Sequence, residues 1–156
     1  MHPSGYYLAA GYIDKVRIMH VLHDDLREFR ILEIKNCTRM KFSNGGQFLA
    51  ITDQKNIYLY ASYTVTNLIP NNRPFKCPSQ GISAISFNAQ DTCMVVISND
   101  GFVYRYDMIT FTQAKDGTID RNCDFKACLF LPDPLDDFKV LAVGSDAQRA
   151  MFKVYN

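Results

Sequence analysis

Short runs that alternate apolar and polar residues, separated by polar turns, recur along the whole chain. The clearest example spans residues 38–60, where an alternating run ends at the turn 43–46 and two further apolar runs flank a second turn at 53–56. This alternation has the two-residue period of a β-strand with one buried face. The stretch therefore predicts a three-stranded antiparallel meander.

The same unit is repeated through the sequence. Met1, Phe42, Phe87 and Phe130 stand at equivalent places, separated by 41, 45 and 43 residues. Repeats of about 40 to 45 residues are typical of the blades of WD-repeat propellers. We therefore predict an all-β WD-repeat β-propeller of about four blades, with boundaries near residues 1–34, 35–76, 77–122 and 123–156.

The predicted strands follow the apolar runs, and no segment shows helical periodicity. Residues 70–74 contain two prolines and interrupt the pattern, because proline has no N–H group for a strand ladder. Asp100 and Gly101 suit the positive φ of a hairpin turn. The strands are expected at residues 7–11, 16–19, 29–34, 38–42, 48–51, 57–60, 67–69, 82–87, 94–97, 102–106, 126–130, 139–143 and 150–155.

The predicted ring is incomplete. The first unit lacks an inner strand and the last lacks an outer one, so we expect an open arc. An arc exposes apolar blade faces that a closed propeller buries. The chain is therefore expected to be a fragment of a larger propeller or to need a partner that covers its ends. Asp14, Asp100 and Asp146 hold the same turn position in their units and are expected to be structural.

Charge and composition exclude several classes of function. The formal net charge is +1 and the basic residues are not clustered, so the sequence does not predict a nucleic-acid-binding protein. No apolar run approaches roughly 18 residues, and the first residues do not resemble a signal peptide. The five cysteines are odd in number and none forms a C-x-x-C pair. We expect an intracellular chain with reduced, structural cysteines and no membrane partner.

The candidate chemical residues favour a chain without an active site. His20 and His23 are three apart, which on a strand directs them to opposite faces, and no further metal ligand is near in sequence. Cys37 could approach His20, but no third orienting group accompanies them. Paired carboxylates such as Asp24 and Asp25 fall in polar turns, where water solvates them. We therefore predict no catalytic residue, metal or cofactor.

Two kinds of loop are candidates for contact with another protein. The turn of the fourth unit is three residues longer than its counterpart and exposes acidic and apolar side chains. Basic or amide side chains in two other loops could meet an acidic partner. The predicted partner-binding residues are Lys55, Asn71 and Arg73 in these loops, and Asp133, Leu135, Asp136 and Asp137 in the longer turn.

Several segments resemble a known family. They are MHPSGYYLAAGYIDKVRIMHVLHDDLREF (residues 1–29), NCTRMKFSNGGQFLAITDQKNIYLY (residues 36–60) and, more weakly, residues 142–146. They are similar to axonemal WD-repeat proteins among the cilia- and flagella-associated proteins, and the run from Asp14 to Arg17 is among the most specific parts. The likeness covers most of residues 1–106.

This resemblance implies a non-catalytic structural adaptor of the motile-cilium axoneme. Such proteins combine propellers with a coiled coil and help dock inner dynein arms or their regulators on doublet microtubules. The implied partners are other axonemal proteins in a hetero-oligomeric assembly, and the implied location is the ciliary or flagellar cytoskeleton. The alternative is a general WD-repeat scaffold subunit of a cytoplasmic complex outside cilia.

Overall fold

The computed structural model describes residues 1–77, 81–119, 123–131, 139–145 and 149–155. Its regular elements are strands and one short 3-10 turn, η1. In chain order they are β1 (Tyr7–Gly11), β2 (Val16–Val21), β3 (Leu26–Leu32), β4 (Arg39–Phe42), β5 (Phe48–Thr52), β6 (Asn56–Ala61), η1 (Pro70–Asn72), β7 (Phe75–Lys76), β8 (Ile82–Phe87), β9 (Cys93–Ser98), β10 (Phe102–Asp107), β11 (Thr112–Thr118), β12 (Asp124–Phe130), β13 (Val140–Ser145) and β14 (Ala150–Tyr155).

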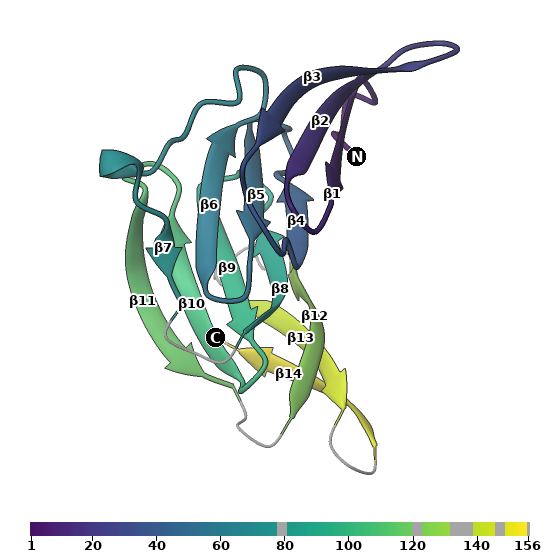
Figure 1. Cartoon of the computed structure of the whole chain (residues 1–156). Coiled ribbons are helices and arrows are strands. Elements are labelled where there is room, and N and C mark those ends of the chain that lie inside the picture. The colour runs from purple at the N-terminus through teal and green to yellow at the C-terminus, as the bar shows by residue number, and fades with distance from the viewer. Residues whose placement is uncertain (78–80, 120–122, 132–138, 146–148, 156) are drawn as a thin grey trace.

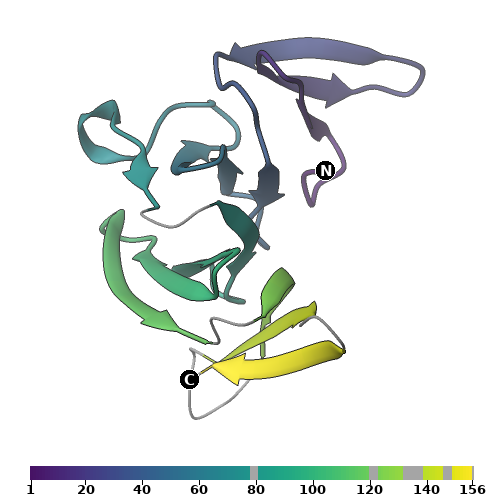
Figure 2. The same cartoon turned by 60° about the horizontal axis from the view of Figure 1, so that its bottom comes forward.

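The strands form four antiparallel sheets that follow one another along the chain. Sheet 1 is β1-β2-β3, sheet 2 is β4-β5-β6-β7, sheet 3 is β8-β9-β10-β11, and sheet 4 is β12-β13-β14. Figures 1 and 2 show the sheets succeeding one another as an open arc, with sheets 1 and 4 at its two ends. The predicted all-β, partial propeller is confirmed, while the boundaries between units remain a prediction.

Apolar side chains fill each junction between neighbouring sheets. Ile18 and Leu49 belong to the buried cluster between sheets 1 and 2, and Leu59 and Tyr106 to the cluster between sheets 2 and 3. Val95 and Phe125 lie in the third cluster, between sheets 3 and 4. Each internal sheet is therefore covered on both faces, because alternate residues of a strand point to opposite sides.

The turns at the start of each meander repeat the same hydrogen bonds. The N–H of Gly46 donates to the carbonyl of Ser43, and the N–H of Asp91 donates in the same way to Asn88. Gly46 and Asp91 both have positive φ, as the fourth residue of this turn requires. The equivalence of the second and third units, predicted from the spacing, is therefore confirmed.

Most predicted strands are present, but the outer strand of sheet 2 was placed wrongly. Residues 67–69 contribute only an isolated bridge between Asn67 and Tyr60, and β7 forms the edge instead. Pro70 follows these residues and has no N–H group for a ladder hydrogen bond. The chain pairs with β6 again only at Phe75, in β7. β3 begins at Leu26 and ends at Leu32, earlier at both ends than predicted, and β11 was not predicted.

In the described part of the chain, no helix has the length and apolar character needed to cross a lipid bilayer.

Candidate functional site: the Gln54 face

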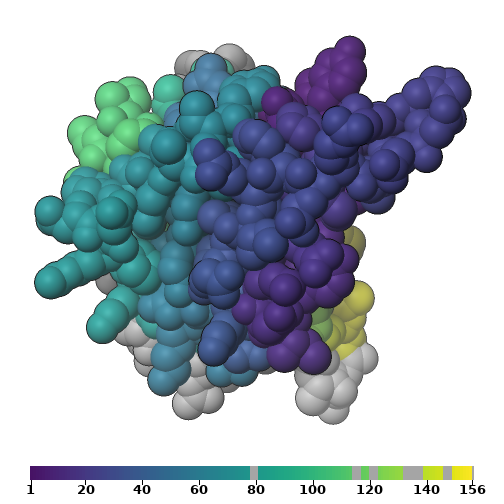
Figure 3. Space-filling view, turned by 45° about the horizontal axis from the view of Figure 1, so that its top comes forward, coloured from purple at the N-terminus to yellow at the C-terminus, as the bar shows by residue number. Residues whose placement is uncertain are grey.

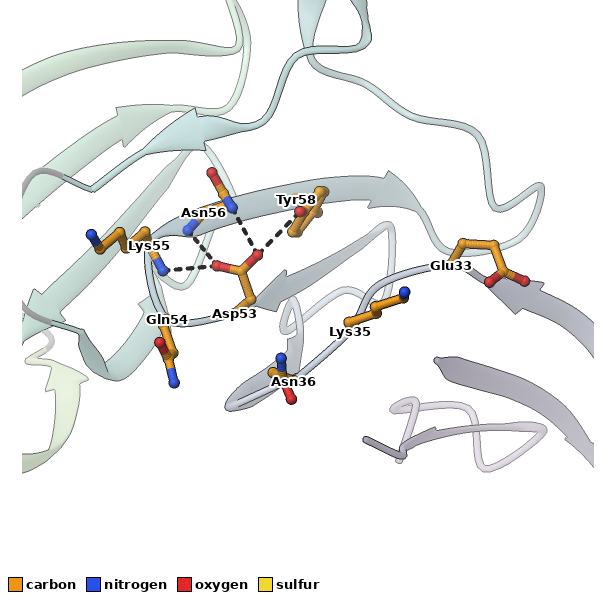
Figure 4. Close-up of a pocket in the computed structure, with 8 residues that line it drawn as sticks. All are labelled: Glu33, Lys35, Asn36, Asp53, Gln54, Lys55, Asn56 and Tyr58. Atoms are coloured by element: carbon orange, nitrogen blue, oxygen red, sulfur yellow. Dashed lines mark hydrogen bonds between the residues drawn. The ribbon is translucent and has the colours of Figure 1, made fainter. Parts of the chain in front are cut away.

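The turn that joins β5 to β6 is held by one carboxylate. Oδ1 of Asp53 accepts hydrogen bonds from the backbone N–H groups of Lys55 and Asn56, both at 2.7 Å. Oδ2 accepts from the side-chain amide of Asn56 at 2.8 Å and from the hydroxyl of Tyr58 at 3.1 Å (Figure 4). An Asp side chain that bonds the backbone two and three residues ahead stabilises such a turn. The two remaining turn residues, Gln54 and Lys55, are exposed.

These hydrogen bonds also influence the protonation states of Asp53 and Tyr58. Partial burial alone would raise the pKa of Asp53, but the hydrogen bonds from Asn56, Lys55 and Tyr58 outweigh it and lower the pKa below its ordinary value. Burial and the neighbouring negative charge of Asp53 raise the pKa of Tyr58. At neutral pH the turn therefore carries a carboxylate and a neutral phenol.

Three adjoining hollows surround this turn, and Gln54 lines all of them. The first, of about 420 Å³, lies between the β5–β6 turn and the linker that follows β3, which contributes Glu33 and Lys35 (Figure 4). The second, of about 560 Å³, reaches Asn99 of sheet 3, and the third, of about 720 Å³, reaches Ile13 of sheet 1. We call the surface formed by these hollows the Gln54 face.

The Gln54 face suits a protein partner better than a small ligand. Small-molecule pockets of this volume are mainly apolar and enclose most of the ligand. Here Lys35, Gln54 and Lys55 are exposed around shallow openings, and Ile13, 84% exposed, adds an apolar contact. A rigid polar surface with an isolated apolar side chain can accept side chains from another protein.

The structure brings together only some of the predicted partner-binding residues. Lys55 lines two of the three hollows. Asn71 and Arg73 are exposed near η1, which lies away from the β5–β6 turn along the outer edge of sheet 2 (Figure 1). The remaining candidates, Asp133, Leu135, Asp136 and Asp137, lie outside the described residues. Their roles stay predictions.

Two of the three predicted turn aspartates can be placed on the same face of the arc. Asp14 lines the third hollow, and its carboxylate lies 3.4 Å from the ammonium of Lys15. Asp100 follows Asn99 and accepts a hydrogen bond from the hydroxyl of Ser98 at 2.5 Å. Asp146 lies outside the described residues. The structural role predicted for these residues stays a prediction.

Most residues of the Gln54 face were not predicted from the sequence. Glu33, Lys35 and Asn36 come from a linker, and they meet the β5–β6 turn only because sheets 1 and 2 pack side by side. A signal for Asp53 was present, since Asp followed three residues later by Asn is typical of side-chain-stabilised turns. No local pattern identified Gln54 as the residue shared by the hollows.

The described residues around the face provide no activated nucleophile. Cys37 lines the third hollow, but burial and the negative charge of Asp53 raise the pKa of its thiol, which keeps it protonated. His20 packs against the rings of Tyr7 and Phe29, while exposed His23 contacts Asp24. Among the described residues, no group of three potential ligands could hold a metal ion.

The chain matches no protein-family model. It is 30% identical over 146 residues to mouse cilia- and flagella-associated protein 57, covering 94% of this chain and 11% of that protein. It is 35% identical over 102 residues to cilia- and flagella-associated protein 57 A of Tetrahymena thermophila, covering 65% of this chain and 8% of that protein. The chain thus spans about a tenth of the length of these relatives.

Solved structures of low sequence identity share the fold. The crystal structure of the RRP9 WD40 repeats is 15% identical and superposes with a TM-score of 0.74, covering 92% of this chain and 43% of that chain. The computationally designed Ika4 protein, also 15% identical, has a TM-score of 0.68 and covers 96% of this chain and 84% of that chain. The repeated meanders share the fold of WD40 repeats, and the chain is similar in sequence to cilia- and flagella-associated proteins of mouse and Tetrahymena thermophila.

Proposed function

We propose that this chain is a non-catalytic adaptor of the ciliary axoneme that docks another axonemal protein on the Gln54 face. The observation that carries the proposal is the convergence of three hollows on one exposed side chain, beside a turn held by the Asp53 carboxylate. A surface that is already ordered loses little conformational entropy when a partner binds. Rigid turns on a propeller are therefore suitable for docking.

The proposed partners are inner dynein arms or their regulators, as the family resemblance suggests. The relatives' names support a ciliary role without naming a partner. The face itself carries both charges, from Lys55 on the β5–β6 turn and from Lys35 and Glu33 on the linker that follows β3 (Figure 4). We expect a partner segment with mixed charge, and the loops that contain Arg73 and Asp133 remain candidates for further contacts.

A non-catalytic role is supported by the chemistry of the described residues. Acyl or phosphoryl transfer needs a nucleophile, a base or a bound metal held in mutual contact. The nearest thiol, Cys37, is kept protonated, and the Asp53 carboxylate is fully engaged in its own turn. These groups therefore serve to hold the surface.

Retention on axonemes tests this proposal. Tagged chain would be expressed in ciliated cells, the membranes removed with detergent, and the fraction retained on the axonemes measured. A double variant, Gln54→Arg with Lys55→Glu, changes charge and shape only at exposed positions and should lower retention at least about tenfold, as expected when a central contact is lost. Lys126→Glu, at an exposed position on sheet 4, is the matched control and should be retained normally.

Two results would contradict the proposal. Normal retention of the double variant would show that the Gln54 face is not used for docking. Release of the unmodified chain with the soluble fraction, together with recovery in a complex from cells without cilia, would favour the general scaffold instead.

A further inference from the structure

The side chain of Arg39 is held at the junction of sheets 2 and 3 by backbone carbonyls. Its Nε–H donates to the carbonyl of Ser83 at 2.9 Å, and Nη1 donates to the carbonyl of Thr38 at 3.0 Å. Ser83 is buried in β8, whereas Arg39, at the start of β4, is exposed. Both acceptors are neutral, and a guanidinium has more N–H donors than two such bonds use. Arg39 therefore presents an oriented positive charge with further donors.

Arg39 lies beside the second hollow of the Gln54 face. Thr38 lines that hollow, and Ile82, the neighbour of Ser83, lines it too. The hydroxyl of Thr38 also donates to the carbonyl of Asp53 at 3.0 Å, which holds the start of β4 against the β5–β6 turn. The arginine is therefore fixed at the edge of an existing opening of about 560 Å³.

The described side chains around this hollow offer positive charge and amide groups. Lys55 is the charged residue among them, while Gln54 and Asn99 carry amides that donate hydrogen bonds. All three are exposed. Over the part of the chain that the structure describes, neither Lys55 nor Arg39 forms an ion pair with a carboxylate. Two cations that no carboxylate neutralises therefore adjoin the same opening.

The carboxylates nearest in sequence to the lining of this hollow are engaged in their own turns. Asp53 accepts the hydrogen bonds that hold the β5–β6 turn, and Asp100, beside Asn99, accepts the hydroxyl of Ser98. An opening with positive charge at its edge, and with no acidic residue among the described residues that line it, is complementary to a carboxylate.

We propose that the second hollow binds an aspartate or glutamate side chain of the protein docked on the Gln54 face, with Arg39 and Lys55 as its charge partners. Hydrogen bonds between a guanidinium and a carboxylate are roughly twice as strong as neutral ones. Because two carbonyls already orient Arg39, its side chain loses less conformational entropy when the carboxylate binds. This contact rests on the proposed docking function, and it places an acidic residue of the mixed-charge partner segment against the second hollow.

Binding of an acidic peptide measures this contact directly. The probe is a fluorescein-labelled peptide of alternating glutamate and glycine, followed by fluorescence anisotropy; the same peptide with lysine in place of glutamate should not bind. Asn99→Asp preserves the shape of the side chain but adds a negative charge to the hollow, so the dissociation constant should rise at least about tenfold. Asn72→Asp makes the same change in η1, away from the hollow, and should leave the dissociation constant unchanged.

A pair of arginine variants tests the guanidinium by itself. Figure 3 shows the hairpin of β2 and β3 projecting at one side of the molecule, and this hairpin provides the control. Arg39→Gln should weaken binding of the glutamate peptide at least about tenfold, whereas Arg27→Gln, at an exposed position of β3, should not weaken it. Circular dichroism and thermal unfolding check that each variant is folded. If Arg39→Gln is not, Lys55→Gln replaces it, because Lys55 is exposed in its turn.

Three results with the peptides would overturn the proposal. The first is no binding of the glutamate peptide at up to about 300 µM chain. The second is unchanged binding by Asn99→Asp. The third is a matching phosphoserine peptide that binds at least about tenfold tighter, which would assign the hollow to a phosphorylated segment.

Retention on axonemes separates this contact from docking itself. Release of both Asn99→Asp and the double variant Gln54→Arg with Lys55→Glu would support an acidic residue in the second hollow. If the double variant is released and Asn99→Asp is retained normally, the Gln54 face docks a partner but the acidic contact is overturned. If both are retained, the proposed docking on this face fails as well.

Discussion

The carboxylate of Asp91, in the first turn of sheet 3, accepts the backbone N–H of Gly45 in the first turn of sheet 2 at 2.6 Å. Its other oxygen accepts the N–H of Asn44 at 2.9 Å. The side-chain amide of Asn44 in turn donates to the carbonyl of Asn88 at 2.8 Å. Turns from two consecutive sheets are thus joined by charge-assisted hydrogen bonds, which are stronger than neutral ones.

Replacing Asp91 should therefore loosen the junction between sheets 2 and 3. Asp91→Ala removes both acceptors and leaves two backbone N–H groups without partners, so the free energy of unfolding should fall by about 2 to 3 kcal/mol. Asp91→Asn keeps one acceptor oxygen and tolerates the positive φ, and it should lose about half as much. Urea unfolding at neutral pH measures the loss in free energy of unfolding for both variants. Equal losses would contradict the prediction, because they would show that the acceptor oxygen kept by Asn does not stabilise the junction.

Two glycines allow the contact between sheets 1 and 2 to be measured by itself. Gly46 and Gly5 have nearly the same φ, 77° and 78°. A methyl group on Gly46 would come within 2.5 Å of Nε2 of His2, which hydrogen-bonds the Gly46 carbonyl, whereas a methyl on Gly5 would meet nothing within 4 Å.

Gly5→Ala should lower the free energy of unfolding by about 1 kcal/mol, through backbone strain alone. Gly46→Ala should lower it by about 3 kcal/mol, because it adds a steric clash with buried His2 to the same strain. Thermal unfolding of the two variants measures the difference between their losses in free energy of unfolding. If the two variants lose the same free energy of unfolding, His2 moves aside without cost and does not stabilise the contact between sheets 1 and 2.

The lowered pKa of Asp53 predicts a pH-dependent contribution to stability. The folded-state pKa is below the ordinary value of 3.8, so folding favours the ionised carboxylate. Its contribution is fully present above the ordinary pKa and is lost as the pH falls through the lowered, folded-state pKa. The stability advantage of the unmodified chain over Asp53→Asn should therefore shrink at acid pH. Urea unfolding at about pH 6 and about pH 3 measures it, and an advantage that is unchanged at the lower pH would contradict the prediction.

The cysteines should differ in reactivity although all five are thiols. Burial raises the pKa of Cys128 to about 12, and it also raises the pKa of half-buried Cys37. Since the thiolate is the reactive form, Cys128 should resist iodoacetamide at about pH 8 in the folded chain, and the more accessible Cys37 should be modified first. Peptide mapping by mass spectrometry identifies the order. In urea all five should react at similar rates; early modification of Cys128 in the folded chain would argue against the packing of sheets 3 and 4.

The sequence predicted most strands because each sheet has a strictly local signal. In β9 and β10, for example, apolar runs are joined by a turn at Asp100, and the turn residues identify the hairpin without reference to the rest of the chain. The outer edges were the exception. The pattern predicts a strand at residues 67–69, where the structure has only an isolated bridge, and it does not predict β11, because an outer strand has little buried surface and therefore a weak apolar pattern.

The candidate site was much less accessible to prediction. Lys55 was identified from its charge and its turn, but Gln54 and Lys35 carry no local signal, and their proximity depends on two sheets that pack side by side. The contact of Asp91 with Gly45 joins residues 46 apart in the same way. Such contacts are set by the angle between neighbouring sheets, which no period in the sequence encodes.

Local sequence patterns are sufficient to specify a series of antiparallel meanders, because a two-residue apolar alternation and turn residues act over a few neighbouring positions. Packing between the sheets specifies which turns share hydrogen bonds and where the hollows of the Gln54 face open. Those features arise when side chains from separate repeats fill a common space, so they depend on the packing of whole sheets.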